Sequence, residues 1–140
     1  MNLDIFSQIN WLALLVASLA YFMLGAIWYS KSVFGSKWIE LVKLDIKDPD
    51  LKKGMGKMMT ATFFLVLVTC LGLALLIVKF DFVGFFASIK LGLLTGLCFA
   101  TTAVSINYVY ENKPNGLYFI NNGYHVLGHV LAAVILVMWR

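Results

Sequence analysis

The chain has 140 residues, enough for one compact unit and too few for two domains of ordinary size. Apolar residues make up 61% and charged residues only 13%, about half the charged share of soluble domains, so the composition excludes an ordinary soluble fold. The formal net charge of +4 does not indicate a nucleic-acid partner, because most of the basic residues lie in one segment between apolar runs.

Four apolar runs are each long enough to cross a membrane, because about 20 helical residues span a hydrocarbon core of ~30 Å. They predict spans at about residues 9–29, 58–78, 85–107 and 117–139, all within a single membrane domain over residues 1–140. The short second and third connections favour antiparallel neighbours. The predicted fold class is therefore all-α, an integral membrane bundle of four transmembrane helices.

The distribution of lysines predicts the orientation. Seven of the eleven basic residues lie in the loop 30–57, and Lys113 lies in the loop 108–116. The opposite side holds only Lys79, Arg140 and the amino terminus. The positive-inside rule then places both of these loops in the cytoplasm and both termini outside, for a multi-pass membrane protein.

The first loop contains the segment "KSVFGSKWIELVK", in which Phe34, Trp38 and Leu41 recur at helical spacing. This pattern predicts a short amphipathic helix lying in the headgroup region between the first and second spans. The rest of the loop, "LDIKDPDLKKGMGK", is predicted to be an exposed turn and linker. Its lysines either contact anionic lipid or serve only to fix the topology.

Small residues recur at helical spacing on three of the spans. In the third span they are Gly92, Gly96 and Ala100, and such stripes allow helix backbones to approach closely. They fit a packed interior or a dimer contact, so we expect a homo-oligomer and favour a dimer. Cys70 and Cys98 fall inside apolar runs and are interpreted as small apolar side chains.

Polar side chains interrupt the fourth span in the segment "NNGYHVLGHV". Asn121 and His125 lie close to one helix face, and Asn122 and His129 lie farther round. Buried polar groups in a membrane need partners, and candidates exist on the first and third spans: Trp28, Tyr29, Thr101, Thr102, Ser105 and Asn107. Three interpretations remain open, which are interhelical hydrogen bonding, a polar cavity or pathway, and ligation of a metal or cofactor.

The histidine pair by itself is a weak metal signal. Two histidines four residues apart can reach one ion, but no carboxylate or cysteine lies at an evident partner depth to complete a site. We therefore predict no metal and no cofactor. The sequence also contains no carboxylate pair and no combination of nucleophile and base, so an enzyme is not expected.

Lys90 is the one charged residue well inside a predicted span. Its long side chain can extend to the interface from near a helix end. The alternative is pairing with Asp81 or with the anionic group of a substrate.

Several segments together resemble a known family: "GAIWYS" at residues 25–30, "FGSKW" at residues 34–38 and "INNGYH" at residues 120–125. They are similar to the small membrane proteins grouped as domain of unknown function 1761, and the resemblance covers nearly the whole chain. Lys31 stands where that family often has proline. The resemblance implies a bacterial four-helix protein of the inner membrane and no particular activity. It also implies that residues from these segments belong to one shared feature: Trp28, Tyr29, Phe34, Gly35, Trp38, Asn121, Tyr124 and His125.

The leading hypothesis is a non-enzymatic membrane protein that binds or passes a small solute through a polar pocket open to the cytoplasm. Asn121, His125 and Tyr124, with Trp28 and Tyr29, would line the pocket, and Phe34 and Trp38 would anchor a lid. The other polar residues, His129, Asn122, Asn107, Thr102 and Lys90, are predicted to act between helices. The alternative is a scaffold or assembly protein whose polar groups serve only helix packing.

Overall fold

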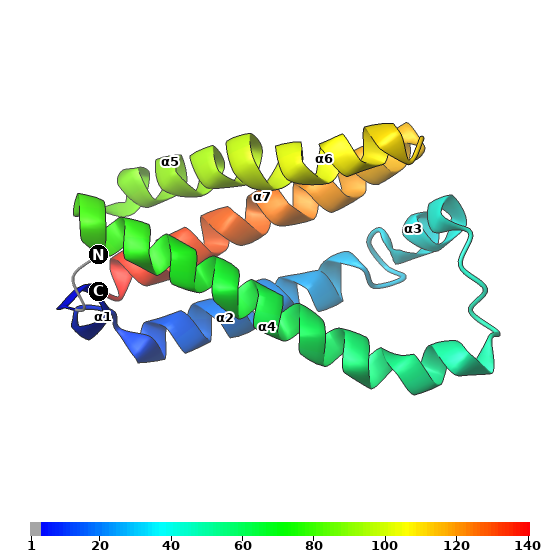
Figure 1. Cartoon of the computed structure of the whole chain (residues 1–140), viewed down its shortest axis with the longest axis horizontal. Coiled ribbons are helices and arrows are strands. Elements are labelled where there is room, and N and C mark those ends of the chain that lie inside the picture. The colour runs from blue at the N-terminus through cyan, green and yellow to red at the C-terminus, as the bar shows by residue number, and fades with distance from the viewer. Residues whose placement is uncertain (1–3) are drawn as a thin grey trace.

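The computed structural model describes residues 4–140, which form helices and no strands (Figure 1). Four of its helical segments are long and apolar enough to cross a membrane, which confirms the predicted fold class of a multi-pass helical membrane protein. The elements in chain order are α1 (Asp4–Ser7), α2 (Trp11–Trp28), α3 (Gly35–Val42), α4 (Pro49–Phe80), α5 (Phe85–Thr95), the π-helix η1 (Gly96–Ala100), α6 (Thr101–Tyr110) and α7 (Asn115–Met138).

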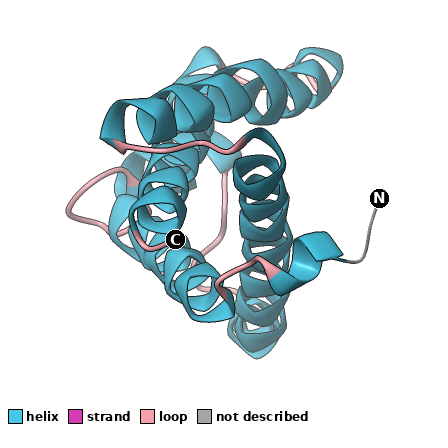
Figure 2. Cartoon of the chain, turned by 90° about the vertical axis from the view of Figure 1, so that its left-hand side faces the viewer, coloured by secondary structure: helices cyan, strands magenta, loops and turns pink. Residues whose placement is uncertain are grey.

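Helix α7 is the centre of the bundle, because it packs against α2, α4 and the α5–η1–α6 segment. Figure 1 shows α1 and the C-terminus at one end of the bundle and α3 at the other. We call these the terminal end and the α3 end, and the halves of the bundle next to them the terminal half and the α3 half. Figure 2 looks onto the terminal end, where the C-terminus lies near the middle of the view with helices around it. The alternation of chain direction agrees with the predicted antiparallel order of spans.

The terminal half of the bundle has an apolar core. Its side chains are almost completely buried and come from α2, α4 and α7: Ala13, Leu14, Leu73, Ala74, Ile77, Ala132, Ala133, Leu136 and Val137. Polar contacts close this end. Asn10 Oδ1 accepts from the Ala13 backbone N–H at 3.0 Å, and Asn10 Nδ2 donates to the Trp139 carbonyl at 2.9 Å. Arg140 Nη1 lies 2.6 Å from Asp81 Oδ1 in the α4–α5 turn.

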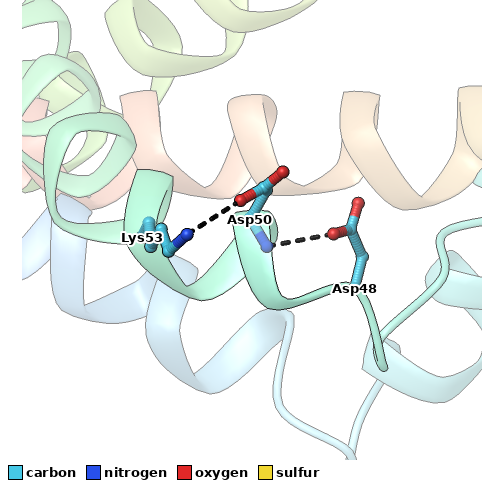
Figure 3. A network of polar contacts seen from close by, with 3 residues as sticks. All are labelled: Asp48, Asp50 and Lys53. Carbon is cyan, nitrogen blue, oxygen red and sulfur yellow. Dashed lines mark hydrogen bonds and ion pairs between the residues drawn. The ribbon is translucent and has the colours of Figure 1, made fainter.

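Helix α4 begins much earlier than the sequence suggested. The prediction of an exposed linker up to residue 57 is wrong from Pro49 onward. Asp48 accepts from the Asp50 backbone N–H at 3.0 Å, Pro49 occupies the first turn, and Lys53 pairs with Asp50 at 3.2 Å (Figure 3). A cap, a first-turn proline and an acidic first turn are strong helix-start signals, and they outweigh the two glycines that follow. The 32 residues of α4 extend about 48 Å, longer than a bilayer core.

The third span is not one continuous α-helix. Residues Gly96–Ala100 form a π-helical turn, closed by a bond from the Thr101 backbone N–H to the Gly96 carbonyl. Such a turn contains one extra residue, and one residue corresponds to about 100° of helix rotation. The face that α6 presents to α7 is therefore rotated relative to the face predicted from an unbroken helix.

The predicted amphipathic helix is present as α3, but its apolar side packs on the protein itself. The ring centroid of Phe34 lies 4.7 Å from that of Trp28, and Trp38 lies 5.7 Å from Tyr29 in an edge-to-face contact. Leu41 lies over Gly116 at the start of α7. Helix α3 thus covers the ends of α2 and α7.

Candidate functional site

A buried tyrosine joins both histidines of α7. Tyr21, on α2, places its hydroxyl oxygen 3.1 Å from His125 Nδ1 and 3.2 Å from His129 Nδ1. This approach is possible because Gly128 lies under the tyrosine ring, and a Cβ atom there would overlap the ring. Tyr21 and His129 are almost completely buried. The α2–α7 contact therefore contains a Tyr–His–His cluster near mid-bundle.

The hydrogen bonds of this cluster place a hydrogen on one imidazole nitrogen. His129 Nδ1 lies 2.7 Å from the His125 carbonyl oxygen, which can only accept, so this nitrogen donates. The Tyr21 hydroxyl oxygen lies 3.1 Å from His125 Nδ1, 3.2 Å from His129 Nδ1 and 3.4 Å from the His125 carbonyl oxygen. The cluster offers hydrogen-bond donors and acceptors and contains no carboxylate, lysine or arginine.

A second cluster lies closer to the α3 end, where α2, α6 and α7 meet. The Tyr29 hydroxyl donates to Asn121 Oδ1 at 2.7 Å, and Asn121 Nδ2 donates to the Tyr108 hydroxyl oxygen. Trp38 of α3 lies directly against the Tyr29 ring. A single asparagine therefore connects three helices beneath α3.

Tyr124 lies between the two clusters. Its ring centroid is 5.3 Å from Tyr21, 5.4 Å from Tyr29 and 5.1 Å from His125. Its ring also lies against Gly25, where a Cβ atom would come within 3.1 Å of the hydroxyl oxygen. The rings form a continuous aromatic path from α3 to the histidines.

Two further polar contacts fix α7 against its neighbours. Trp28 Nε1 donates to the Ile120 carbonyl at 2.8 Å, and Asn122 Nδ2 donates to Ser105 Oγ at 2.9 Å. The amide oxygen of Asn122 is buried and receives no hydrogen bond from any described residue. Asn121 and Asn122 thus project to different sides of α7. Asn121 bonds to Tyr29 at the end of α2 and to Tyr108 of α6, whereas Asn122 bonds to α6 alone.

The structure brings together all five residues predicted to line the pocket, which are Trp28, Tyr29, Asn121, Tyr124 and His125. Three of the residues predicted to act between helices lie outside both clusters. Thr102 is exposed and donates to carbonyls of its own helix, and Asn107 and Lys90 are also exposed. The π-helical turn explains the first two, because it rotates Thr102 and Asn107 away from α7 and brings Ser105 and Tyr108 toward it. Lys90 does not pair with Asp81, whose partner is Arg140.

Two members of the clusters were missed by sequence reasoning. Tyr21 lies within an apolar run and was read as part of it, although it shares a face with Ala17 and Gly25, which could have signalled close contact with another helix. Tyr108 was not among the residues predicted from the sequence. No sequence signal identifies the π-helical turn.

The described residues contain no group of three His, Cys, Asp or Glu side chains that could hold one metal ion. The side chains that meet here are tyrosine, histidine, asparagine and tryptophan, with no carboxylate, lysine or arginine among them. They can bind a partner through hydrogen bonds and ring contacts.

The family model described as "Protein of unknown function (DUF1761)" matches residues 12–137. The chain belongs to this family. The DUF1761 match includes every residue of the two clusters and the whole of α3, so these features lie inside the family's domain, whereas α1 lies outside it. Neither the curated proteins nor the solved structures include a match to the chain.

Proposed function

We propose that this protein is a non-enzymatic membrane protein that binds a small polar solute at the α3 end of the bundle and holds it against the Asn121 and His125 side chains. We further propose that this end faces the cytoplasm, because eight lysines lie in the two segments that connect the predicted spans at this end, residues 30–57 and 108–116. The observation that carries the proposal is the Tyr29–Asn121–Tyr108 contact, where three helices meet through one asparagine.

The chemistry of the two clusters favours an uncharged ligand. A solute with donors and acceptors can replace the bonds among Tyr29, Asn121 and Tyr108 one for one, which avoids leaving buried polar groups unpaired. No Asp, Glu, Lys or Arg takes part in either cluster. A charged solute would have no counter-charge at this depth.

Helix α3 is suited to act as a lid. It contacts the bundle mainly through Phe34, Trp38 and Leu41, and short segments join it to the long helices on both sides. Displacing Trp38 would expose Tyr29 and, behind it, Tyr124. Aromatic lids of this kind can exclude water while giving way to an entering solute.

The test is native mass spectrometry of the full chain, purified in mild detergent and incubated with the small-molecule fraction of a bacterial extract. We expect a bound small-molecule mass on the unmodified protein, and a loss of at least about tenfold in the N121A/H125A double variant, which removes two hydrogen-bonding side chains. The matched control is T102A/N107A, which removes two polar side chains from the exposed face of α6.

The competing function is a scaffold or assembly role, favoured by the fact that the cluster side chains already bond to one another. In that case N121A/H125A would lower thermal stability and the yield of any homo-oligomer, while no bound mass would depend on these residues. A protein that binds no small molecule, or binds it equally in both double variants, would contradict the proposed function.

A further inference from the structure

Four oxidisable rings lie in one line from α3 to the histidines of α7. The ring centroid of Trp38 lies 5.7 Å from that of Tyr29, and Tyr29 lies 5.4 Å from Tyr124. Tyr124 in turn lies 5.3 Å from Tyr21. We call these four residues the aromatic path. Tryptophan and tyrosine give up a single electron more readily than phenylalanine or the aliphatic side chains, so each ring of the path can pass an electron to the next.

Exposure to solvent decreases along the aromatic path. Trp38 and Tyr29 are partly exposed, whereas Tyr124 and Tyr21 are only 7% and 2% exposed. A dissolved oxidant can therefore contact Trp38 but not Tyr21. An oxidising equivalent that arrives at Tyr21 has to come through the rings between them.

Tyr21 differs from the other tyrosines of the path in the partner of its hydroxyl group. Its oxygen lies 3.1 Å from His125 Nδ1, and an imidazole nitrogen can take up a proton. The Tyr29 hydroxyl donates instead to the amide oxygen of Asn121, which is a very weak base. A tyrosine that loses an electron becomes a strong acid and has to release its hydroxyl proton. Tyr21 is thus the tyrosine of the path at which a radical can form by giving its proton to a base.

The second histidine also contacts the hydroxyl of Tyr21. His129 Nδ1 lies 3.2 Å from this oxygen and 2.7 Å from the His125 carbonyl oxygen, to which it donates. A tyrosyl radical has lost its own hydrogen, and its oxygen can only accept. A protonated His125 would offer this oxygen a charge-assisted hydrogen bond, and the Nδ1–H group of His129 lies within reach as a second donor.

We propose that Tyr21 is a redox-active residue, which holds an oxidising equivalent that enters the protein at Trp38. The oxidant, a one-electron acceptor in contact with Trp38, gains the electron that Tyr21 loses, and the two rings between them carry it. The hydroxyl proton of Tyr21 moves to His125 Nδ1 as the electron leaves. The products are the oxidant reduced by one electron, a neutral tyrosyl radical and a protonated His125, so atoms and charge balance.

The experiment uses the full chain in mild detergent with tris(bipyridine)ruthenium(II) and pentaamminechlorocobalt(III). A flash of light lets the cobalt complex take an electron from the ruthenium complex, which becomes a ruthenium(III) one-electron oxidant. Samples are frozen at set times and studied by electron paramagnetic resonance. We expect a long-lived tyrosyl radical that is absent in Tyr21→Phe. In deuterated water, electron–nuclear double resonance should detect an exchangeable deuteron that is hydrogen-bonded to the radical oxygen.

Two variants test the base and the path separately. His125→Phe keeps a ring but removes the proton acceptor, and should lower the yield of the Tyr21 radical at least about tenfold. Tyr124→Phe interrupts the path while it leaves Tyr21 and His125 in place, and should also lower the yield several-fold. Its matched control is Tyr118→Phe, at a tyrosine outside the path that packs on Tyr108, and should leave the yield unchanged.

Three results would overturn the proposal: no tyrosyl radical that outlives those of the exposed tyrosines, a long-lived radical that persists in Tyr21→Phe, or equal yields in His125→Phe, Tyr124→Phe and the unmodified chain. The radical is measured without added solute, so failure of the solute site and failure of the redox-active tyrosine can be told apart.

Discussion

The two halves of this bundle are built from different interactions. The terminal half is mainly apolar, with Ala13, Ile77 and Ala132 packed closely. Its polar contacts are those at its very end and that of the buried Ser18, whose hydroxyl donates to the Leu14 carbonyl at 2.8 Å. The α3 half contains tyrosines, histidines and asparagines bonded across helices. The same helix, α7, forms both halves, so the difference lies in side chains and not in architecture.

This difference indicates a division of roles. Lipid tails are as apolar as the side chains between helices, so helices in a membrane gain little from the hydrophobic effect when they associate. Close packing of small and apolar side chains is then the main source of stability. Interhelical hydrogen bonds in membranes contribute only about 0.6 kcal/mol on average, so the α3 half gains little stability from its many polar groups. Polar groups that contribute little to stability but are held in fixed geometry are suited to binding. The predictions below test this division, from the largest effect to the smallest.

The largest effect is expected at the boundary of the halves. Gly128→Ala would place a Cβ atom inside the Tyr21 ring and should destabilise the bundle by about 3 kcal/mol, because α2 and α7 must separate or Tyr21 must leave both histidines. Thermal unfolding in detergent measures this. Gly72→Ala, at a position with open space around the new methyl group, is the control and should be neutral or slightly stabilising. Equal effects of the two substitutions would contradict the described α2–α7 contact.

A substitution that creates a cavity in the terminal half should lower the free energy of unfolding without affecting solute binding. Ile77 is 2% exposed, and Ile77→Ala should destabilise the protein by about 2–3 kcal/mol. The same sample should retain the bound small-molecule mass in native mass spectrometry. Loss of that mass at a temperature where the variant is still folded would show that the two halves do not have separate roles.

Removing a polar contact in the α3 half should have the opposite effect, which is a small loss of stability and a larger loss of solute binding. Tyr29→Phe removes the donor to Asn121 Oδ1 and should lower stability by only about 1 kcal/mol, while solute binding falls several-fold. Tyr110→Phe, at a tyrosine that is 88% exposed, is the matched control and should change neither quantity. A large loss of stability in Tyr29→Phe with binding intact would favour the scaffold function.

The smallest effect is expected at the Arg140–Asp81 ion pair. Asp81 is 79% exposed in this pair, so solvent screens the attraction. Asp81→Asn should change the free energy of unfolding by no more than about 0.5 kcal/mol, measured as a small shift in thermal midpoint that disappears at high salt. A larger effect would mean that this contact, and not the apolar packing, holds the terminal end together.

The sequence was sufficient to predict the features that depend on composition and on the local spacing of residues. Span positions follow from the length of apolar runs, and the short helix α3 follows from the spacing of Phe34, Trp38 and Leu41. The polar character of α7 was also visible, because asparagine and histidine are rare in lipid and need protein partners.

Other features depend on relationships that a single sequence does not display. The π-helical turn changes the rotation of α6, so partners chosen on an ideal helix, Thr102 and Asn107, proved to be outside the site. Helix α4 begins at Pro49 because a local cap overrides a composition that resembles a linker. Tyr21 belongs to the site only because Gly128, more than 100 residues later, leaves room for its ring.

Amide hydrogen–deuterium exchange along α7, measured in nanodiscs, tests the division of the bundle most directly. Residues 119–123 and 130–134 lie equally far from the ends of this helix, so fraying affects both in the same way. We predict clearly faster exchange in residues 119–123, because a solute site beneath α3 must open to water, and near-complete protection in residues 130–134. Equal protection of the two segments would contradict the account, because the polar half would then be as closed as the apolar one.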